Sequence, residues 1–247
     1  MKGIILAGGT GSRLFPLTKV TNKHLLPVGR YPMIFHSIYK LKQAGLTDIL
    51  IVTGKEHMGD VVSLLGSGSE LGVEFTYKVQ DEAGGIAQAL GLAENFVGED
   101  KMVVILGDNV FEDDITPFVN NFADQNIGAK ILIQEVEDPH RFGVPEISGD
   151  AIVSIEEKPL YPKSSYAVTG IYMFDHNVFN LIKSLKPSHR GELEITDVNN
   201  KYIEQGELTY GILKGWWTDA GTHSSLMRAN TLAKYIEFGE EFGKLKV

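Results

Sequence analysis

Cysteine is absent from the 247 residues of this chain. Without a thiol, the chain can form neither a disulfide framework nor a thiolate zinc site, and nothing in it calls for an oxidising compartment. Long apolar runs are absent too. The stretch from Ile4 to Ala7 is far too short for the core of a signal peptide, and no run approaches the roughly 20 apolar residues of a membrane span. These absences predict a cytoplasmic protein without a membrane segment.

Positive charge is also scarce. The chain has 23 lysine and arginine residues against 32 aspartate and glutamate residues, which gives a formal net charge of -9 at pH 7. Nonspecific nucleic-acid binding and attraction to an anionic membrane both require a basic surface, so the charge argues against both classes of partner. A polyanionic ligand would have to be held by a few locally placed cations.

The chain does contain a regular alternation of two patterns. Short apolar, strand-like runs occupy residues 2–7, 48–53, 73–79 and 102–106, and helical spacing of apolar residues lies between them, as in 34–44, 61–65 and 86–93. This order predicts an α/β fold with a doubly wound, mostly parallel sheet and helices on both faces.

The second half of the chain has a different pattern. Strand-like runs follow one another from 129 to 174, and helical periodicity returns at 192–203 and 226–236. The sheet should therefore be mixed rather than purely parallel. Because no low-complexity linker and no internal repeat interrupts the chain, residues 1–247 are predicted to form a single domain.

The first strand-like run ends in the stretch GIILAGGTGSRL, residues 3–14. In a doubly wound sheet, the loop after the first strand commonly binds phosphate, and glycines let main-chain N–H groups point together at an anion. An ordinary glycine turn explains the glycines equally well. The spacing fits neither the dinucleotide fingerprint nor the P-loop. Arg13 and Lys23 follow on an irregular segment, and together they favour a lid that closes over a triphosphate, although either alone is typical of a solvated surface charge.

Two aspartates are placed where strands should end. Asp108 lies in LGDN after an apolar strand, and Asp219 lies in WWTDAGTH before a glycine turn into a helix. Mg²⁺ that bridges phosphates is usually held by one or two protein carboxylates, so the pair is a candidate metal site. The competing interpretation is a helix cap or a turn aspartate at 108 and a helix cap at 219.

The second half supplies polar groups suited to a sugar phosphate. Glu157 and Lys158 follow a predicted strand, the turn-like VTG at 168–170 interrupts the next one, and RGELEITD at 190–197 opens a helix with acids. Acids in a first helical turn also complement the helix dipole, and Glu157 with Lys158 could be an exposed ion pair of little consequence. A sugar needs carboxylates and backbone groups for its hydroxyls, and its phosphate needs cations such as Lys158 and Arg190.

Eight motifs together resemble one known family. LAGGTGSRL, KHLLPV, LGDN, RFGV, EEKP, YAVTGIY, RGELEITD and DAGTH occur in the order and at nearly the spacing of glucose-1-phosphate thymidylyltransferases, within the sugar nucleotidyltransferase superfamily. The resemblance runs from Met1 to about Tyr235. It implies a Rossmann-like nucleotidyltransferase fold, with a nucleotide-binding half at about 1–128 and a sugar-phosphate-binding half at about 129–247. The implied reaction is Mg²⁺-dependent formation of dTDP-glucose and pyrophosphate from dTTP and α-D-glucose 1-phosphate, for biosynthesis of deoxysugars such as rhamnose.

The resemblance also assigns roles to individual residues. It implies catalytic roles for Arg13, Lys23, Asp108 and Lys158, and metal ligation by Asp108 and Asp219. The implied nucleotide contacts are Leu6, Ala7, Gly8, Gly9, Gly11, Arg13, Lys23, Gln80, Gly85 and Asp108. The implied sugar-phosphate contacts are Asn109, Gly143, Glu157, Lys158, Val168, Thr169, Gly170, Arg190 and Glu192.

Three departures from the family pattern bear on specificity and regulation. His24 stands where many members have glutamine, and Ala83 with Gly84 replaces a proline and an aspartate common in the base pocket. A UTP-dependent uridylyltransferase therefore stays open as an alternative, as does a regulator that binds sugar nucleotides without turnover. Longer members carry a further helical segment with a regulatory site, which we expect this chain to lack. The assembly is predicted to be a monomer or a small homo-oligomer, with the apolar face of 226–236 in the core.

Overall fold

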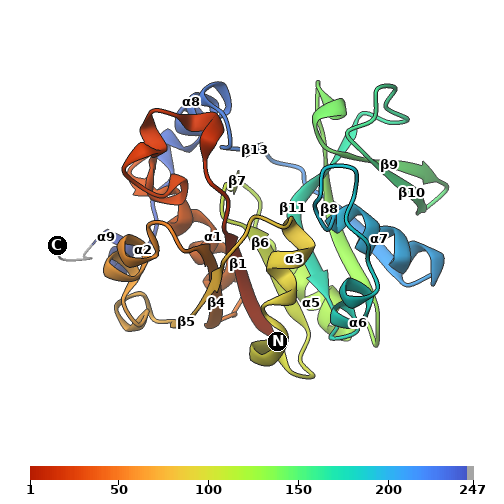
Figure 1. Ribbon diagram of the computed structural model, residues 1–247, viewed down its shortest axis with the longest axis horizontal. Coiled ribbons are helices and arrows are strands. Elements are labelled where there is room, and N and C mark those ends of the chain that lie inside the picture. Colours follow the sequence, from red (N-terminus) through yellow and green to blue (C-terminus); the bar gives the residue numbers. More distant parts are fainter. Residues whose placement is uncertain (244–247) are drawn as a thin grey trace.

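The computed structural model describes residues 1–243, and a seven-stranded sheet runs through its centre (Figure 1). The strand order is β12-β8-β11-β6-β1-β4-β5. β11 runs antiparallel to both of its neighbours, whereas the other neighbouring pairs are parallel, so the predicted mixed sheet is confirmed. The strands are β1 (Lys2–Ala7), β4 (Asp48–Gly54), β5 (Glu74–Gln80), β6 (Met102–Leu106), β8 (Ala129–Glu135), β11 (Tyr166–Phe174) and β12 (Leu208–Ile212).

Both faces of the sheet are buried under helices, as predicted. Successive side chains of β1 point to opposite faces, so Ile5 and Ala7 join one apolar cluster while Ile4 and Leu6 join another. The cluster of Ile5 includes residues of α1 (Met33–Gln43), α2 (Met58–Leu65) and α5 (Thr116–Asp124). The cluster of Ile4 includes residues of α3 (Ile86–Gly91), α4 (Glu94–Val97), α6 (Val178–Lys183) and α7 (Ile195–Glu204).

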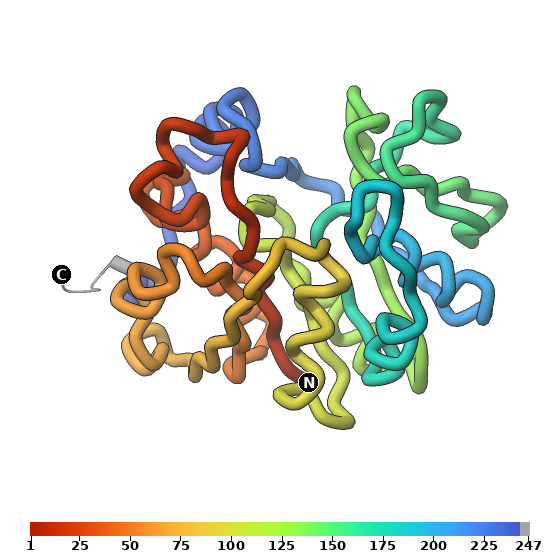
Figure 2. Tube along the Cα trace, in the orientation of Figure 1, coloured from red at the N-terminus to blue at the C-terminus, as the bar shows by residue number. Residues whose placement is uncertain are grey.

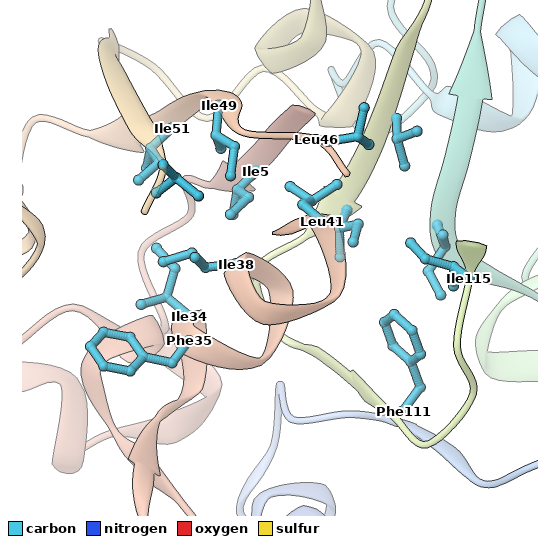
Figure 3. Packing of buried hydrophobic residues seen from close by; sticks show 14 of the residues in the cluster. Ile5, Ile34, Phe35, Ile38, Leu41, Leu46, Ile49, Ile51, Phe111 and Ile115 are labelled. Carbon is cyan, nitrogen blue, oxygen red and sulfur yellow. The ribbon is translucent and has the colours of Figure 1, made fainter. Parts of the chain in front are cut away.

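Helix α1 shows how helical spacing produces this cover. Ile34, Ile38 and Leu41 recur on one side of the helix, and in Figure 3 they lie toward Ile5 and Ile49 of the sheet. All five side chains are fully buried. Burial of each such side chain contributes about 1.5–3 kcal/mol to folding. This packing fixes the position of β1, whose carboxyl end leads into the glycine loop.

Three two-stranded antiparallel ribbons accompany the central sheet. β7 (Asn109–Phe111) pairs with β13 (Trp217–Asp219), and Asp219 is the partner of Asn109 in that register. β9 (Gly143–Ser148) pairs with β10 (Ala151–Glu157), which sets Gly143 opposite Glu157. The third ribbon joins β2 (Pro27–Val28) to β3 (Tyr31–Pro32). The pairing of β7 with β13 thus makes neighbours of residues more than 100 positions apart in the chain.

The segment after β1 packs on the carboxy-terminal helix α8 (His223–Leu232). Figure 2 shows the red amino-terminal loop beside the blue part of the tube, and the carbonyl of Phe15 accepts a hydrogen bond from His223 Nε2 at 2.8 Å. Leu226, Ala229 and Ala233 are buried in one cluster with Leu14. The predicted core role of this helix face is therefore confirmed. A last short helix, α9 (Glu240–Gly243), follows.

One predicted helix start is wrong. The run from 192 was expected to open a helix with its acids in the first turn, but α7 begins at Ile195. Glu194 has extended backbone angles in front of the helix, and its carboxylate binds other partners than the first-turn N–H groups. Glu192 lies further upstream. Neither residue therefore serves as a first-turn acid, and only Asp197 occupies that turn.

None of the helices within residues 1–243 has the length and apolar character needed to cross a membrane.

Candidate active site

A cavity of about 620 Å³ lies at the carboxyl ends of the central strands, and both halves of the chain line it. Most of the residues singled out in the sequence meet there. From the predicted nucleotide side it is lined by Leu6, Gly8, Gly9, Arg13, Lys23, Gln80, Gly85 and Asp108. From the predicted sugar side it is lined by Asn109, Gly143, Glu157, Lys158, Val168, Gly170, Arg190, Glu192 and Asp219.

Three predicted contact residues are not brought to the cavity wall. Ala7 is fully buried in the apolar cluster under the sheet. Thr169 is fully buried as well, and its hydroxyl donates a hydrogen bond to the carbonyl of Leu132 at 2.8 Å, away from the cavity. Gly11 has a φ of +62° and packs against Thr18. These residues support the walls of the site from behind.

The backbone of the glycine loop lies close to the side chain of Gln80. A Cβ atom on Gly8 would lie only 2.1 Å from Oε1 of Gln80, so any larger residue would displace that side chain. Gln80 is buried, and its Nε2 donates to Oε1 of Gln88 at 2.6 Å. Gly9 has a φ of +96°, a conformation that suits glycine. The loop therefore keeps its backbone close to an amide side chain that can recognise the edge of a base.

Asp108 is held by a largely buried ion pair. Its Oδ2 lies 2.6 Å from Nζ of Lys23, and its Oδ1 accepts a hydrogen bond from Nδ2 of Asn109 at 3.0 Å. Burial alone would raise the pKa of Asp108, but the charge and hydrogen bond of Lys23 and the bond from Asn109 outweigh it, so the pKa lies well below its usual range. Asp108 is ionised at every physiological pH.

Asn109 connects the two sides of the cavity. Its Oδ1 accepts hydrogen bonds from the backbone N–H of Gly170 at 2.8 Å and from Nε1 of Trp217 at 2.7 Å. A Cβ on Gly170 would lie 2.6 Å from Asn109 Nδ2, which explains the glycine at that point of β11. The pairing of β11 with β8 is also irregular between Val168 and Tyr172. The predicted interruption of this strand at VTG is wrong, because β11 continues through 168–170 and only its pairing with β8 is irregular there.

The second carboxylate faces the first across one small space. An ideal Cβ on Gly221 would lie 3.3 Å from Oδ2 of Asp219, 3.6 Å from Oδ2 of Asp108 and 3.1 Å from Nη2 of Arg13. Burial and then the negative charge of Asp108 raise the pKa of Asp219. Two converging carboxylates that repel each other form a donor set suited to a divalent cation with hard oxygen ligands, so these residues fit Mg²⁺.

The alternative role of Asp219 as a helix cap is wrong. The residue at the amino-terminal cap of α8 is Thr222, whose side chain accepts a hydrogen bond from the backbone N–H of Ser225. The side chain of Ser225 in turn bonds the N–H of Thr222, which completes a capping box. The Asp219 carboxylate is therefore left to face the cavity.

The sugar side of the cavity begins at the end of β10. Oε2 of Glu157 accepts a hydrogen bond from the hydroxyl of Thr196 at 2.7 Å, while its Oε1 lies 3.4 Å from Nζ of Lys158. Lys158 has a φ of +48°, which is uncommon for a residue with a side chain and turns its ammonium back beside Glu157. Arg190 Nη2 lies 3.7 Å from Oε1 of Glu157. Two cations thus flank one carboxylate.

Two loops of the cavity are tied together by backbone bonds. Leu193 donates its N–H to the carbonyl of Gly84 at 2.8 Å and accepts a hydrogen bond from the N–H of Ala87 at 3.2 Å. A Cβ on Gly85 would lie 2.5 Å from the Leu193 carbonyl oxygen, and Gly85 has a φ of +99°. Glycine is therefore required at 85 for the close approach. The loop after β5 and the segment before α7 form one wall.

Sequence reasoning missed several residues that line the cavity. Arg141 lies 3.7 Å from Oδ1 of Asp219, and Trp217, Tyr172, Thr196 and Glu194 also reach the cavity. Arg141 could have been found from the motif RFGV, where only the glycine received a role. Trp217 depends on the pairing of β13 with β7, for which a three-residue strand gives no local signal.

His24, the departure in the lid segment, is buried and neutral. Burial and then the charge of Lys23 lower the pKa of its imidazole to about 3. Oδ1 of Asn22 accepts the backbone N–H of His24 at 2.9 Å and lies 2.7 Å from the ring Nδ1, so Nδ1 carries the proton. A neutral ring cannot neutralise phosphate charge. The cations that line the cavity near His24 are Arg13 and Lys23.

A family model, curated relatives and solved structures match this chain. Residues 2–235 match the family described as nucleotidyl transferase. A glucose-1-phosphate thymidylyltransferase of Neisseria meningitidis is 45% identical over 241 residues, which cover 96% of this chain and 84% of the relative. A crystal structure from Bacillus anthracis, described as a candidate glucose-1-phosphate thymidylyltransferase in complex with a sucrose, is 70% identical with a TM-score of 0.96 over 98% of this chain and 99% of that one.

A more distant structure shares the fold alone. A UDP-glucose pyrophosphorylase complexed with UDP-glucose is 22% identical, with a TM-score of 0.84 over 93% of this chain and 97% of that one. The family match spans almost the whole chain, and several relatives at 43–45% identity carry the name glucose-1-phosphate thymidylyltransferase. This chain therefore belongs to the nucleotidyl transferase family, within the group of glucose-1-phosphate thymidylyltransferases.

Proposed function

We propose that this chain joins dTTP and α-D-glucose 1-phosphate to form dTDP-glucose and pyrophosphate, the entry step to deoxysugars such as rhamnose. The observation that carries the proposal is the convergence of Asp108, Asp219 and Arg13, each of which has a side-chain atom within 3.6 Å of the ideal Cβ position on Gly221. A carboxylate pair next to a cation is suited to metal-assisted chemistry on phosphates, and the same cavity continues to the sugar-side groups Glu157 and Lys158.

The proposed reaction needs no general base. A phosphate monoester has a second pKa of about 6, so glucose 1-phosphate is largely a dianion at neutral pH and its oxygen can attack the α-phosphorus directly. Catalysis then depends on alignment and on charge neutralisation. Arg13 and Lys23 are proposed to neutralise the departing pyrophosphate. Lys158 and Arg190 are proposed to hold the phosphate of the sugar in line.

We propose Asp108 and Asp219 as the residues that hold Mg²⁺, which when bound would polarise the phosphoryl oxygens and balance their charge. Within residues 1–243, no group of three or more His, Asp or Glu side chains is placed to hold a metal. The site would therefore use these two carboxylates together with oxygens of the substrates.

The roles of the remaining residues follow from their places in the cavity. Gln80, with Gly8, Gly9 and Gly85 around it, is proposed to recognise the base. Glu157 and the backbone at Gly143 and Val168 are proposed to hold the glucose hydroxyls. The protein is proposed to act in the cytoplasm, as a monomer or a small homo-oligomer, without nucleic acid or membrane as partner.

A pyrophosphate-release assay tests the proposed reaction. Purified protein is incubated with dTTP or UTP, each combined with several sugar 1-phosphates, in the presence of Mg²⁺. We expect the highest kcat/KM for dTTP with glucose 1-phosphate. A higher kcat/KM with UTP would favour the uridylyltransferase alternative, and binding without pyrophosphate release would favour a regulator.

A further inference from the structure

One edge of the Arg190 guanidinium is hydrogen-bonded to Glu194. Its Nε donates to Oε1 of Glu194 at 3.1 Å, and its Nη2 donates to Oε2 at 2.7 Å. A guanidinium has five N–H groups in one plane, and this bidentate pair uses two of them. Within residues 1–243 the guanidinium bonds run through Nε and Nη2, which leaves Nη1 on the side opposite Glu194 available, and Arg190 lines the cavity. One edge is anchored while the other can receive a ligand.

Glu194 is itself held in place. The hydroxyl of Ser188 donates to Oε1 of Glu194 at 2.7 Å and accepts a hydrogen bond from the backbone N–H of Arg190 at 3.2 Å. The Glu194 side chain is only 12% exposed. The three residues therefore close a small ring of hydrogen bonds that fixes both the backbone and the side chain of Arg190.

The position of Glu194 in the fold makes this arrangement unusual. It occupies the amino-terminal cap position of α7, yet its side chain makes no capping hydrogen bond. A short polar residue there would normally bond the N–H groups of the first turn and stabilise the helix. Glu194 instead directs both oxygens to Arg190. Burial would raise its pKa, but the bonds from Arg190 and Ser188 lower it, so the carboxylate stays ionised at neutral pH.

Other acids near Arg190 do not bind it in this way. Oε2 of Glu192 and Oε1 of Glu157 lie 3.5 and 3.7 Å from Nη2, at the limit of or beyond hydrogen-bond distance. Glu192 is also 40% exposed. Glu194 is the acid with short bonds to both nitrogens of one edge. Its role can therefore be separated from that of its neighbours by mutation.

We propose that Glu194 is a positioning residue, which orients Arg190 so that the free guanidinium edge receives the phosphate group of the sugar substrate. The inference rests on the sugar-phosphate role proposed above for Arg190. Pre-orientation removes the cost of ordering a long side chain when the ligand binds. Loss of Glu194 should therefore weaken binding of the sugar phosphate more than that of the nucleotide.

Steady-state kinetics of Glu194→Gln test this role. The variant keeps the shape of the side chain but removes its charge. We expect the KM for glucose 1-phosphate to rise about 10-fold, with the KM for dTTP changed less than twofold. Glu194→Asp, which keeps the charge and shortens the reach, should give an intermediate increase. The matched control is Glu146→Gln, because Glu146 pairs with Lys163 on the surface and does not line the cavity.

A double-mutant cycle with Arg190→Ala distinguishes positioning from a structural effect. If Glu194 acts through Arg190, Glu194→Gln should add less than twofold to the KM for glucose 1-phosphate in the Arg190→Ala background. Multiplication of the two increases would overturn the inference, as would equal increases in both KM values. If Arg190→Ala raises this KM and Glu194→Gln does not, the inference alone fails. If Arg190→Ala leaves this KM unchanged, the proposed role of Arg190 fails as well.

Discussion

The two ends of the cavity hold their cations in different ways. At the nucleotide end, Lys23 is buried against Asp108, with side chains only 12% and 14% exposed. At the sugar end, Lys158 and Arg190 are 49% and 32% exposed and lie among several carboxylates. The first pair depends on exclusion of water, which strengthens a single interaction. The second end depends on a hydrogen-bonded network near solvent, where a single pair contributes less.

This contrast predicts that substitutions at the nucleotide end have the larger effects. Asp108→Asn and Asp219→Asn should each lower kcat about 10³-fold, because each removes one of two carboxylates proposed to share a metal. The double variant should be little worse than either single variant, since residues that act as a unit are not additive. Pyrophosphate release at saturating substrate measures the effect. Independent, multiplying losses would contradict a shared ion, and EDTA should abolish turnover until Mg²⁺ is added back.

The next largest effect is expected at Arg13. A cation that neutralises the leaving pyrophosphate matters more in the transition state than in the ground state, so Arg13→Ala should lower kcat about 10²-fold. The KM for glucose 1-phosphate should change little. Arg30→Ala is a matched control, because Arg30 pairs with Glu237 on the surface. A variant with wild-type kcat and only a raised KM for dTTP would make Arg13 a binding residue alone.

Substitution of the two aspartates should change the thermal stability in opposite directions. Asp108→Asn leaves Lys23 without its carboxylate in a largely buried place, and we expect the Tm to fall by about 3–10 °C. Asp219→Asn removes a carboxylate whose ionisation burial and Asp108 disfavour, so without Mg²⁺ the Tm at pH 7 should rise by about 1–3 °C. Thermal melts of both variants in EDTA provide the measurement. A loss of stability in both would contradict the proposed repulsion.

The pH dependence of the same melts tests the stability change expected for Asp219→Asn. The lowered pKa of Asp108 gives stability that is present above its unfolded value near 3.8 and is lost as the pH falls through the folded pKa. The raised pKa of Asp219 has the opposite sign. The ionised Asp219 carboxylate destabilises the fold at neutral pH. This destabilisation disappears as the pH falls through the folded pKa of Asp219, because the wild-type side chain then becomes neutral as well. The gain of Asp219→Asn should therefore shrink toward acid pH.

Local sequence patterns predicted most of the sheet and much of the site. The bounds of β1 and β6 were predicted without error, because glycine or charge ends each apolar run. α5, α6 and β12 were missed, since α6 has six residues and β12 is only half-buried. Trp217 enters the site through strand pairing across some 100 residues, which no local pattern encodes. Arg141 lies in the motif RFGV, where only the glycine received a role. The family resemblance supplied roles, but the contacts of Glu194 are visible only in the fold.

The backbone tie at Leu193 joins the wall of the base pocket to the segment that carries Arg190 and Glu194. Two loops that share hydrogen bonds cannot be ordered independently. If the nucleotide binds against Gly85 as proposed, part of the entropy cost of ordering the segment proposed to bind the sugar phosphate is already met, and the reverse holds if the sugar phosphate binds first. Thermodynamic linkage requires both effects to be equal. Each substrate should therefore raise the affinity for the other by the same factor, even though their subsites lie in different halves of the chain.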